Sequence, residues 1–305
     1  MKINYTKSGI PLSAFGLGAM NLPTDQEQTN EILKAAIDNQ ITYIDTADLY
    51  QKGKNEAIIG KFLKENKLRQ DVIIGSKVGN AFNMNNDEVT WDPSAKHIKE
   101  GIINSLKRLN TDYIDLYMLH GGTIEDNKEE VIHTFESLKK EGIIRAYGIS
   151  SIRPNVIDYY LKHSNIDTIM MQFNLIDNRP ESLIDSIESK DVKILARGPL
   201  MKGLLTDKYE SILDRKFREG TLDLSYESIK HALETANKSG NLSELSYEYL
   251  MQFPVASIVN GASSKAQLIS NIRHFENVMK SETNNRTIND IRKMFSNLEY
   301  KDHLV

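Results

Sequence analysis

The sequence predicts an α/β protein folded as a (β/α)8 barrel, and three observations lead to this prediction. Eight short β-rich runs recur along the 305 residues. Between them lie stretches with helical spacing of apolar residues, each long enough for a crossover helix. No clear linker divides the chain, so we expect one domain over residues 1–305.

The expected strands are nearly continuous apolar segments, as strands that are covered on both faces should be. They cover residues 12–18, 41–46, 71–77, 113–120, 143–150, 167–173, 192–197 and 256–262. In the stretch before the fourth strand, Ile98, Ile102 and Leu106 lie on one helical stripe. Residues 92–94, Asp-Pro-Ser, supply capping chemistry in front of that helix.

Several segments go beyond what a barrel needs. Residues 7–9, Lys-Ser-Gly, lie between two short alternating runs and predict an N-terminal β-hairpin that closes the bottom of the barrel. Residues 79–93 and 206–225 are too long for ordinary βα loops, and we expect them to shape a pocket. Apolar spacing within 283–299 predicts an extra C-terminal helix. The expected fold is therefore a TIM barrel with both additions.

Composition and charge restrict the functional classes. With 40% hydrophobic and 26% charged residues, the chain is of the globular type. The net charge is −4, which argues against nucleic acid or an anionic membrane as the main partner. No apolar run has the length of a membrane span and no secretory signal is recognisable, so we expect a cytoplasmic protein. The absence of cysteine excludes disulfides, thiolate metal sites and cysteine nucleophiles.

Four polar side chains lie at the predicted carboxyl ends of three successive strands. Asp45 ends the second strand and Tyr50 follows it, while Lys77 ends the third and His120 the fourth. Because such strand ends meet at one mouth of a barrel, we expect the four to converge. A tyrosine hydroxyl is a poor acid at neutral pH, but an ammonium at Lys77 would stabilise its phenolate, and Asp45 would hold that ammonium. His120 could orient a substrate oxygen or pass a proton.

Each of these residues also has a structural explanation. An Asp at a strand end often caps the following helix, and a single histidine can be a satisfied core residue. A lysine inside a barrel strand is harder to explain, because an ammonium without a partner is costly to bury. No cluster of histidine with carboxylates indicates a metal site, so we expect no metal and consider an unrelated metal hydrolase the weakest alternative.

Several motifs resemble those of the aldo-keto reductases. Residues 45–50, Asp-Thr-Ala-Asp-Leu-Tyr, are similar to the D-T-A-x-x-Y signature, and residues 111–117 leading to His120 are similar to a second family segment. Further similar segments are Gly16-Leu17-Gly18, Ser76-Lys77, Gly148-Ile149-Ser150-Ser151, Gln172-Phe173-Asn174-Leu175, Gly198-Pro199-Leu200 and Gly261-Ala262-Ser263. Together they cover roughly residues 10–275 in the family's order.

The resemblance implies an NADP(H)-dependent oxidoreductase that reduces a small-molecule aldehyde or ketone to an alcohol. In this interpretation Tyr50 is the general acid, Lys77 and Asp45 tune the acidity of its hydroxyl, and His120 orients the carbonyl. The nicotinamide cofactor would lie extended across the mouth without a Rossmann fold, and no G-x-G-x-x-G opens a helix here.

The positions that match the family's cofactor contacts come from the loops after several strands. They are Met20, Asp45, Ser150, Ser151, Gln172, Arg197, Gly198, Leu200, Gly203, Ser263, Ser264, Gln267 and Asn271. Ser150, Ser151 and Gln172 match the residues that hold the nicotinamide carboxamide, and Met20 matches a backbone contact to its ribose. Residues 198–203 match the loop around the pyrophosphate, where glycine lets the backbone approach closely.

Two departures from the family's pattern leave details open. Arg197 stands where many relatives carry an aromatic that stacks on the nicotinamide; its guanidinium could stack, bind phosphate or bind an anionic substrate. Near the adenosine end, Lys265 is the only positive charge where relatives often grip a 2′-phosphate. We expect NADPH rather than NADH, because helix-terminal N–H groups and hydroxyls also bind phosphate and the family generally prefers it.

An alternative function is a nicotinamide-binding redox sensor or partner protein with slow turnover, like the channel β-subunits of the superfamily. The substrate is expected to be selected by residues 79–93, by residues 206–225 and by the C-terminal end. Within the first of these, Phe82, Met84 and Trp91 are the candidate contacts, and Trp91 either forms a pocket wall or packs the loop onto the barrel. The sequence does not predict the oligomeric state.

Overall fold

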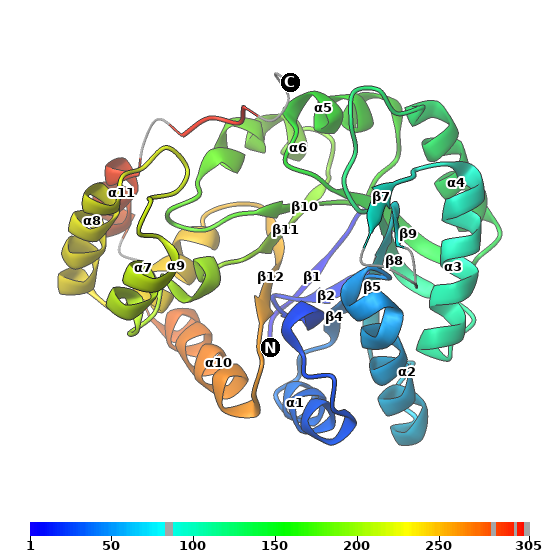
Figure 1. Cartoon of the computed structure of the whole chain (residues 1–305), viewed down its shortest axis with the longest axis horizontal. Coiled ribbons are helices and arrows are strands. Elements are labelled where there is room, and N and C mark those ends of the chain that lie inside the picture. The colour runs from blue at the N-terminus through cyan, green and yellow to red at the C-terminus, as the bar shows by residue number, and fades with distance from the viewer. Residues whose placement is uncertain (83–87, 282–284, 296–297, 302–305) are drawn as a thin grey trace.

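Eight parallel strands close into a barrel in the computed structural model of the chain (Figure 1), in the order β3-β4-β5-β8-β9-β10-β11-β12 with β12 against β3. The structure describes residues 1–82, 88–281, 285–295 and 298–301. The predicted (β/α)8 barrel is therefore confirmed, and each of its strands lies on one of the eight expected runs. The assignment of all 305 residues to one domain stays a prediction.

The barrel strands and the helices follow one another along the chain as the alternating pattern predicts. The strands are β3 (Phe15–Gly18), β4 (Tyr43–Asp45), β5 (Ile73–Val78), β8 (Ile114–Leu119), β9 (Ile144–Ser150), β10 (Thr168–Gln172), β11 (Lys193–Arg197) and β12 (Val255–Gly261). The helices that follow them include α1 (Gln26–Asp38), α2 (Lys54–Asn66), α3 (Ala95–Leu109), α4 (Lys128–Lys140), α5 (Pro154–His163), α6 (Ile184–Glu188), α9 (Leu242–Leu250) and α10 (Lys265–Lys280).

The N-terminal hairpin closes the bottom of the barrel, as predicted. Strands β1 (Ile3–Tyr5) and β2 (Pro11–Ser13) pair antiparallel. Ile10 and Leu12 are buried in one cluster with the side chains that fill the barrel interior. The fully buried carboxylate of Asp167 accepts hydrogen bonds from the hydroxyls of Thr6 and Ser8, at 2.9 Å each, which ties the hairpin to the start of β10.

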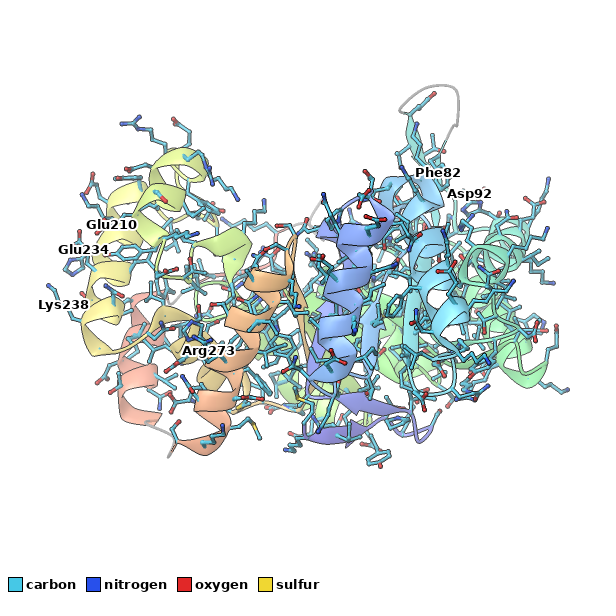
Figure 2. All side chains as sticks on the ribbon, turned by 90° about the horizontal axis from the view of Figure 1, so that it is seen from below. Phe82, Asp92, Glu210, Glu234, Lys238 and Arg273 are labelled. Atoms are coloured by element: carbon cyan, nitrogen blue, oxygen red, sulfur yellow. The ribbon has the colours of Figure 1, made fainter. Side chains whose placement is uncertain are left out.

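The long segment after β5 folds back as a second hairpin at the opposite end of the molecule. Strands β6 (Asn80–Phe82) and β7 (Val89–Trp91) pair antiparallel. Figure 2 shows Phe82 and Asp92 at one end, and the β1–β2 hairpin at the other. The candidate contact Met84 lies outside the described residues.

Residues 206–225, expected to form a long loop that shapes a pocket, are not all loop in the structure. This segment contains α7 (Tyr209–Lys216), which the polar composition had hidden. Tyr209, Ile212 and Leu213 are buried and recur three and four residues apart, so a single apolar stripe is enough to pack this short helix. It contacts α8 (Tyr226–Ser239).

The extra C-terminal helix is present as α11 (Asn285–Met294), within the predicted 283–299. It packs on α8 and α9 at the side of the barrel (Figure 1). Over the described part of the chain, no helix combines the length and the apolar character that crossing a lipid bilayer requires.

Helices α2 and α3 approach each other closely at Gly60. A Cβ atom added at Gly60 would lie 2.3 Å from the backbone oxygen of Arg108 and 2.5 Å from Cα of Leu109. Both neighbours are backbone atoms, which cannot swing aside as a side chain can. Helix α2 follows the segment that carries Tyr50, so this contact fixes the helix directly behind the candidate site.

We therefore expect Gly60→Ala to lower the free energy of unfolding by about 2 kcal/mol, although alanine is the better helix former, because overpacking against backbone outweighs propensity. Urea unfolding measures this. Gly240→Ala is the matched control, since its added methyl would meet nothing closer than 3.7 Å and its backbone is extended; we expect a change below about 0.5 kcal/mol there. Equal effects in both variants would contradict the close-packing account.

Candidate active site

The barrel brings segments that are far apart in the sequence to one rim. In the strand register Gly18 is the partner of both Asp45 and Gly261. Gln172 is the partner of Arg197 at the carboxyl ends of β10 and β11. Because all eight strands are parallel, the predicted site residues at these ends share one mouth.

The ammonium of Lys77 is at the centre of the site and is completely buried. It donates to Oδ2 of Asp45 at 2.7 Å, to the carbonyl of Thr46 at 2.7 Å and to the hydroxyl of Tyr50 at 3.4 Å. Burial alone would lower the pKa of Lys77, but the charges and hydrogen bonds of Asp45 and Tyr50 together outweigh this and raise the pKa above its usual range. Lys77 is therefore an ammonium in the folded protein.

The chain path after β4 explains why Tyr50 reaches Lys77. The backbone N–H groups of Thr46 and Asp48 donate to the carbonyls of Gly75 and Lys77, so this segment continues along β5 beyond the end of β4. Tyr50 then opens a short 3₁₀ helix, η2 (Tyr50–Gly53). Asp45 does not cap the following helix, because Gly53 is the N-cap residue of α2. The structural alternative for Asp45 is thereby excluded.

His120 completes the group of four. Its ring stands edge-on to the ring of Tyr50, with 5.9 Å between the centroids and an angle of 82°. Burial, together with the positive charges of Lys77 and Arg197, lowers the pKa of His120 to about 3. The imidazole is therefore neutral at physiological pH, and its buried Nδ1 has no hydrogen-bond partner within the described chain.

A second layer of residues, which the sequence analysis missed, holds the four in place. The hydroxyl of Tyr43 donates to Oδ1 of Asp45 at 3.2 Å. The hydroxyl of Thr46 donates to Oδ1 of Asn55, whose amide in turn donates to the carbonyl of Ala19. Tyr43 could have been found from its spacing, since residues two apart on a strand point to the same side.

The predicted carboxamide contacts lie at the ends of β9 and β10. Ser150 is the last residue of β9, and the hydroxyl oxygen of the buried Ser151 accepts from the backbone N–H of Arg153 at 3.2 Å. Oε1 of Gln172 accepts from Nη1 of Arg197 at 3.4 Å. The guanidinium of Arg197 thus lies at the rim beside Gln172.

The loop after β11 has the backbone conformation that a close approach requires. Gly198 and Gly203 have φ angles of +64° and +95°, in the left-handed region that favours glycine. Leu200 lies between them and is half-buried. From α9, the hydroxyl of Ser246 donates to the carbonyl of Pro199 and supports the loop from behind, a contact that the sequence analysis missed.

The start of α10 is organised by its own side chains. Ser264 is the N-cap and accepts from the backbone N–H of Gln267. Oε1 of Gln267 accepts from both the backbone N–H and the hydroxyl of Ser263. Asn271 is 6% exposed, and its amide nitrogen has no hydrogen-bond partner among the residues that the structure describes. A buried amide without a partner is compatible with a polar ligand at this end of the site.

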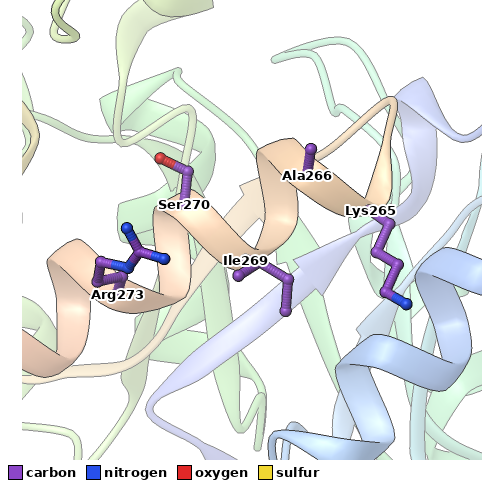
Figure 3. Close-up of a pocket in the computed structure, with 5 residues that line it drawn as sticks. All are labelled: Lys265, Ala266, Ile269, Ser270 and Arg273. Carbon is purple, nitrogen blue, oxygen red and sulfur yellow. The ribbon is translucent and has the colours of Figure 1, made fainter.

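Two cations lie along the exposed face of α10. Lys265, Ile269 and Arg273 recur every fourth residue and line a hollow of about 600 Å³ (Figure 3). Lys265 is therefore directed to the outer surface, and Arg273 is a second positive charge that the sequence analysis did not consider. Met20, expected to contact the ribose, is 58% exposed on the short 3₁₀ helix after β3.

Trp91 packs the β6–β7 hairpin onto the barrel. Its indole N–H donates to Asp126 at 2.8 Å. Its ring covers Gly79 and Gly121, where an added Cβ would meet ring atoms at 2.7 and 3.0 Å. Trp91 therefore covers the residue that follows His120. Within the described residues, no group of three or more His, Asp or Glu side chains is arranged to hold a metal ion.

Comparison with known proteins identifies the family. The aldo/keto reductase family matches residues 14–293. The chain is similar to an uncharacterized oxidoreductase of Bacillus subtilis, YqkF, with 46% identity over 271 residues that cover 87% of this chain and 88% of that protein. It superposes on the holo form of the aldo-keto reductase AKR11C1 from Bacillus halodurans with a TM-score of 0.91, at 41% identity and 99% coverage of both chains. The apo form of that protein gives a TM-score of 0.82.

With its closed barrel, the rim residues described above and these relatives, the chain belongs to the aldo/keto reductase family and is an NAD(P)H-dependent oxidoreductase.

Proposed function

We propose that the protein reduces an aldehyde or ketone to an alcohol with NADPH and that Tyr50 is the proton donor. The observation that carries this proposal is the buried Lys77 ammonium, whose Nζ is 3.4 Å from the Tyr50 hydroxyl. A positive charge at that distance, shielded from water, stabilises the phenolate that remains once the proton has left. A pure binding module would not require this arrangement, which disfavours the sensor alternative.

The residues at the mouth fit a dinucleotide that lies across it. A bound reduced nicotinamide supplies the hydride. Ser150, Ser151 and Gln172 would hold its carboxamide, and the loop over residues 198–203 would hold the pyrophosphate. The partnerless amide of Asn271 and the left-handed glycines of the loop support this assignment.

The preference for NADPH over NADH rests on the start of α10. The first N–H groups of a helix have no intrahelical partners and attract phosphate. Ser263 and Ser264 add hydroxyls there, and Lys265 with Arg273 adds positive charge on the outer face. The remaining proposed contacts are Met20 to the ribose, Gln267 and Leu200. The cytoplasmic location stays a prediction.

Each of the four rim side chains has its own proposed role at the substrate's carbonyl oxygen. Tyr50 donates a proton to it, while Lys77 stabilises the negative charge that Tyr50 acquires and Asp45 holds Lys77 in place. His120 is neutral, so it can donate one hydrogen bond to the substrate oxygen without adding a charge. Orientation and electrostatic stabilisation are the contributions of the protein to the reaction.

The proton-donor assignment predicts that Tyr50→Phe lowers kcat/KM for every accepted carbonyl substrate by about 10² to 10⁴-fold, because a positioned general acid contributes that much. NADPH oxidation against a panel of aldehydes and ketones measures it. Tyr5→Phe, an exposed phenol on the bottom hairpin, is the matched control and should keep full activity. Full activity of Tyr50→Phe on every substrate would falsify the assignment.

The Asp45–Lys77 ion pair predicts that substitutions can restore stability without restoring activity. Lys77→Met leaves the carboxylate buried without its partner, and we expect a loss of about 3 to 5 kcal/mol in the free energy of unfolding. The double variant Asp45→Asn/Lys77→Met should recover much of that loss but none of the activity. Urea unfolding and steady-state kinetics test both parts; if the double variant regains activity, Lys77 has no role in the reaction.

The low pKa of His120 predicts that the contribution of this residue to stability is lost in acid. In the unfolded chain the imidazole titrates near 6.5. Below that pH the unfolded state therefore binds a proton, while the folded state keeps the imidazole neutral. Stability from this group is complete above about pH 7 and falls with pH toward 3. Between pH 7 and 5 the loss is about 2 kcal/mol, and it should disappear in His120→Asn.

Comparing wild type with His120→Asn at each pH isolates the contribution of His120 from that of other titratable groups. Asp48, whose pKa is raised to about 7 by burial and by Glu56, acts in the opposite direction and is present in both. Unfolding curves with the same acid sensitivity in the two proteins would show that His120 is not the neutral, buried group described here.

A further inference from the structure

The side-chain amide of Gln172 is held at both ends, by a carboxylate and by a guanidinium. Its Nε2 donates to Oδ2 of Asp177 at 3.0 Å. Its Oε1 accepts from Nη1 of Arg197 at 3.4 Å. The two contacts lie on opposite ends of one amide, so they act together on its orientation.

The chemistry of these neighbours permits only one orientation of the amide. An ionised carboxylate only accepts hydrogen bonds, and a guanidinium only donates them. A flip of the Gln172 amide would set its oxygen against the carboxylate of Asp177 and its NH₂ against the donors of Arg197. Both contacts would then change from attraction to repulsion.

Asp177 is itself fixed, so it can act as an anchor. It is fully buried and receives Nε of Arg179 on Oδ1 at 2.8 Å and Nη2 of Arg179 on Oδ2 at 3.0 Å. Its backbone N–H donates to Oδ1 of Asn174 at 2.8 Å. The guanidinium of Arg179 lies over the ring of Tyr300, 4.6 Å from its centroid. The anchor is thus built from a turn after β10 and a residue near the C-terminal end.

A consequence follows for what Gln172 can recognise. One N–H of its amide donates to Asp177, and one lone pair of Oε1 faces Arg197. The remaining lone pair of Oε1 is an acceptor, so a ligand group bound there must donate a hydrogen bond. A carboxamide NH₂ meets this requirement, whereas a group that carries only a carbonyl does not.

We propose that Asp177 and Arg179 are positioning residues that fix the Gln172 amide with its oxygen available to the cofactor, so that this position selects a nicotinamide carboxamide through its NH₂ group. The proposal rests on the proposed function, since it assumes that a nicotinamide reaches Gln172. It adds a selectivity that depends on residues beyond those in contact with the cofactor.

The test compares binding of two nucleotides to the intact protein by calorimetry. NADP⁺ carries the carboxamide, and 3-acetylpyridine adenine dinucleotide phosphate replaces it with an acetyl group that keeps the carbonyl but lacks the N–H. We expect wild type to bind NADP⁺ about tenfold more tightly, the worth of one hydrogen bond in a polar site. In Asp177→Asn, whose side chain can also donate, only the 3.4 Å contact with Arg197 still orients the Gln172 amide, and the ratio should fall to about threefold or less.

Two further variants make the outcome specific. Gln172→Met removes the amide and sets the lower limit of the ratio, while Arg179→Lys loses the two-pronged grip on Asp177 and should give an intermediate ratio. If Asp177→Asn does not fold, the Arg179→Lys ratio alone decides, and a wild-type value there overturns the proposal.

The matched control is Asp115→Asn. Asp115 is also a fully buried carboxylate paired with arginines, Arg69 and Arg145, but it lies near the opposite end of its strand. Its loss should lower stability and leave the nucleotide ratio at the wild-type value. An unchanged ratio in folded Asp177→Asn, or a wild type that does not discriminate, overturns the positioning role alone. If wild type binds neither nucleotide, the proposed function fails as well.

Discussion

The buried ammonium of Lys77 is the constraint on which the rest of the candidate site depends. A charged amine removed from water is costly unless oxygen atoms surround it with good geometry. Asp45, the Thr46 carbonyl and the Tyr50 hydroxyl supply three such oxygens. All three belong to β4 and the segment that leaves it, which is itself bonded to β5. The arrangement that makes burial of Lys77 tolerable is therefore also the one that brings a phenol to it.

Two cations, Lys77 and Arg197, and one carboxylate, Asp45, set the charge at the mouth. Lys77 and Arg197 are cations, and together with burial they keep His120 neutral by lowering its pKa. The negative charge of Asp45 is engaged by Lys77, so the field above the pair favours an oxygen that gains negative charge. His120 can then act through hydrogen bonding alone, and its neutral state is set first by its burial and further by the two cations.

The barrel and three of the rim residues, Asp45, Lys77 and His120, could be predicted because both depend on positions along single strands, whereas Tyr50 lies in the segment that leaves β4. The alternation of eight runs places the strands, and a polar residue at the end of a strand such as Lys77 must reach the rim. Contacts made by turns were not predictable in the same way. Asp177 reaches Gln172 because Oδ1 of Asn174 accepts two backbone N–H groups and folds residues 174–177 back. The burial of α7 was likewise concealed by its polar composition, since three apolar positions in eight residues suffice to pack it.

The contact between Arg197 and Gln172 gives a physical sense to an arginine where relatives often carry an aromatic. An aromatic ring offers stacking area but no donor toward Oε1 of Gln172, whereas a guanidinium offers both a planar face and several donors. With Arg197 on one side and Asp177 on the other, the Gln172 amide is oriented before any ligand arrives. An acceptor that is already in place does not have to be ordered when a ligand binds, and affinity gains from that. The orientation of the Gln172 amide is therefore set by its two charged neighbours, which an aromatic ring at position 197 would not achieve.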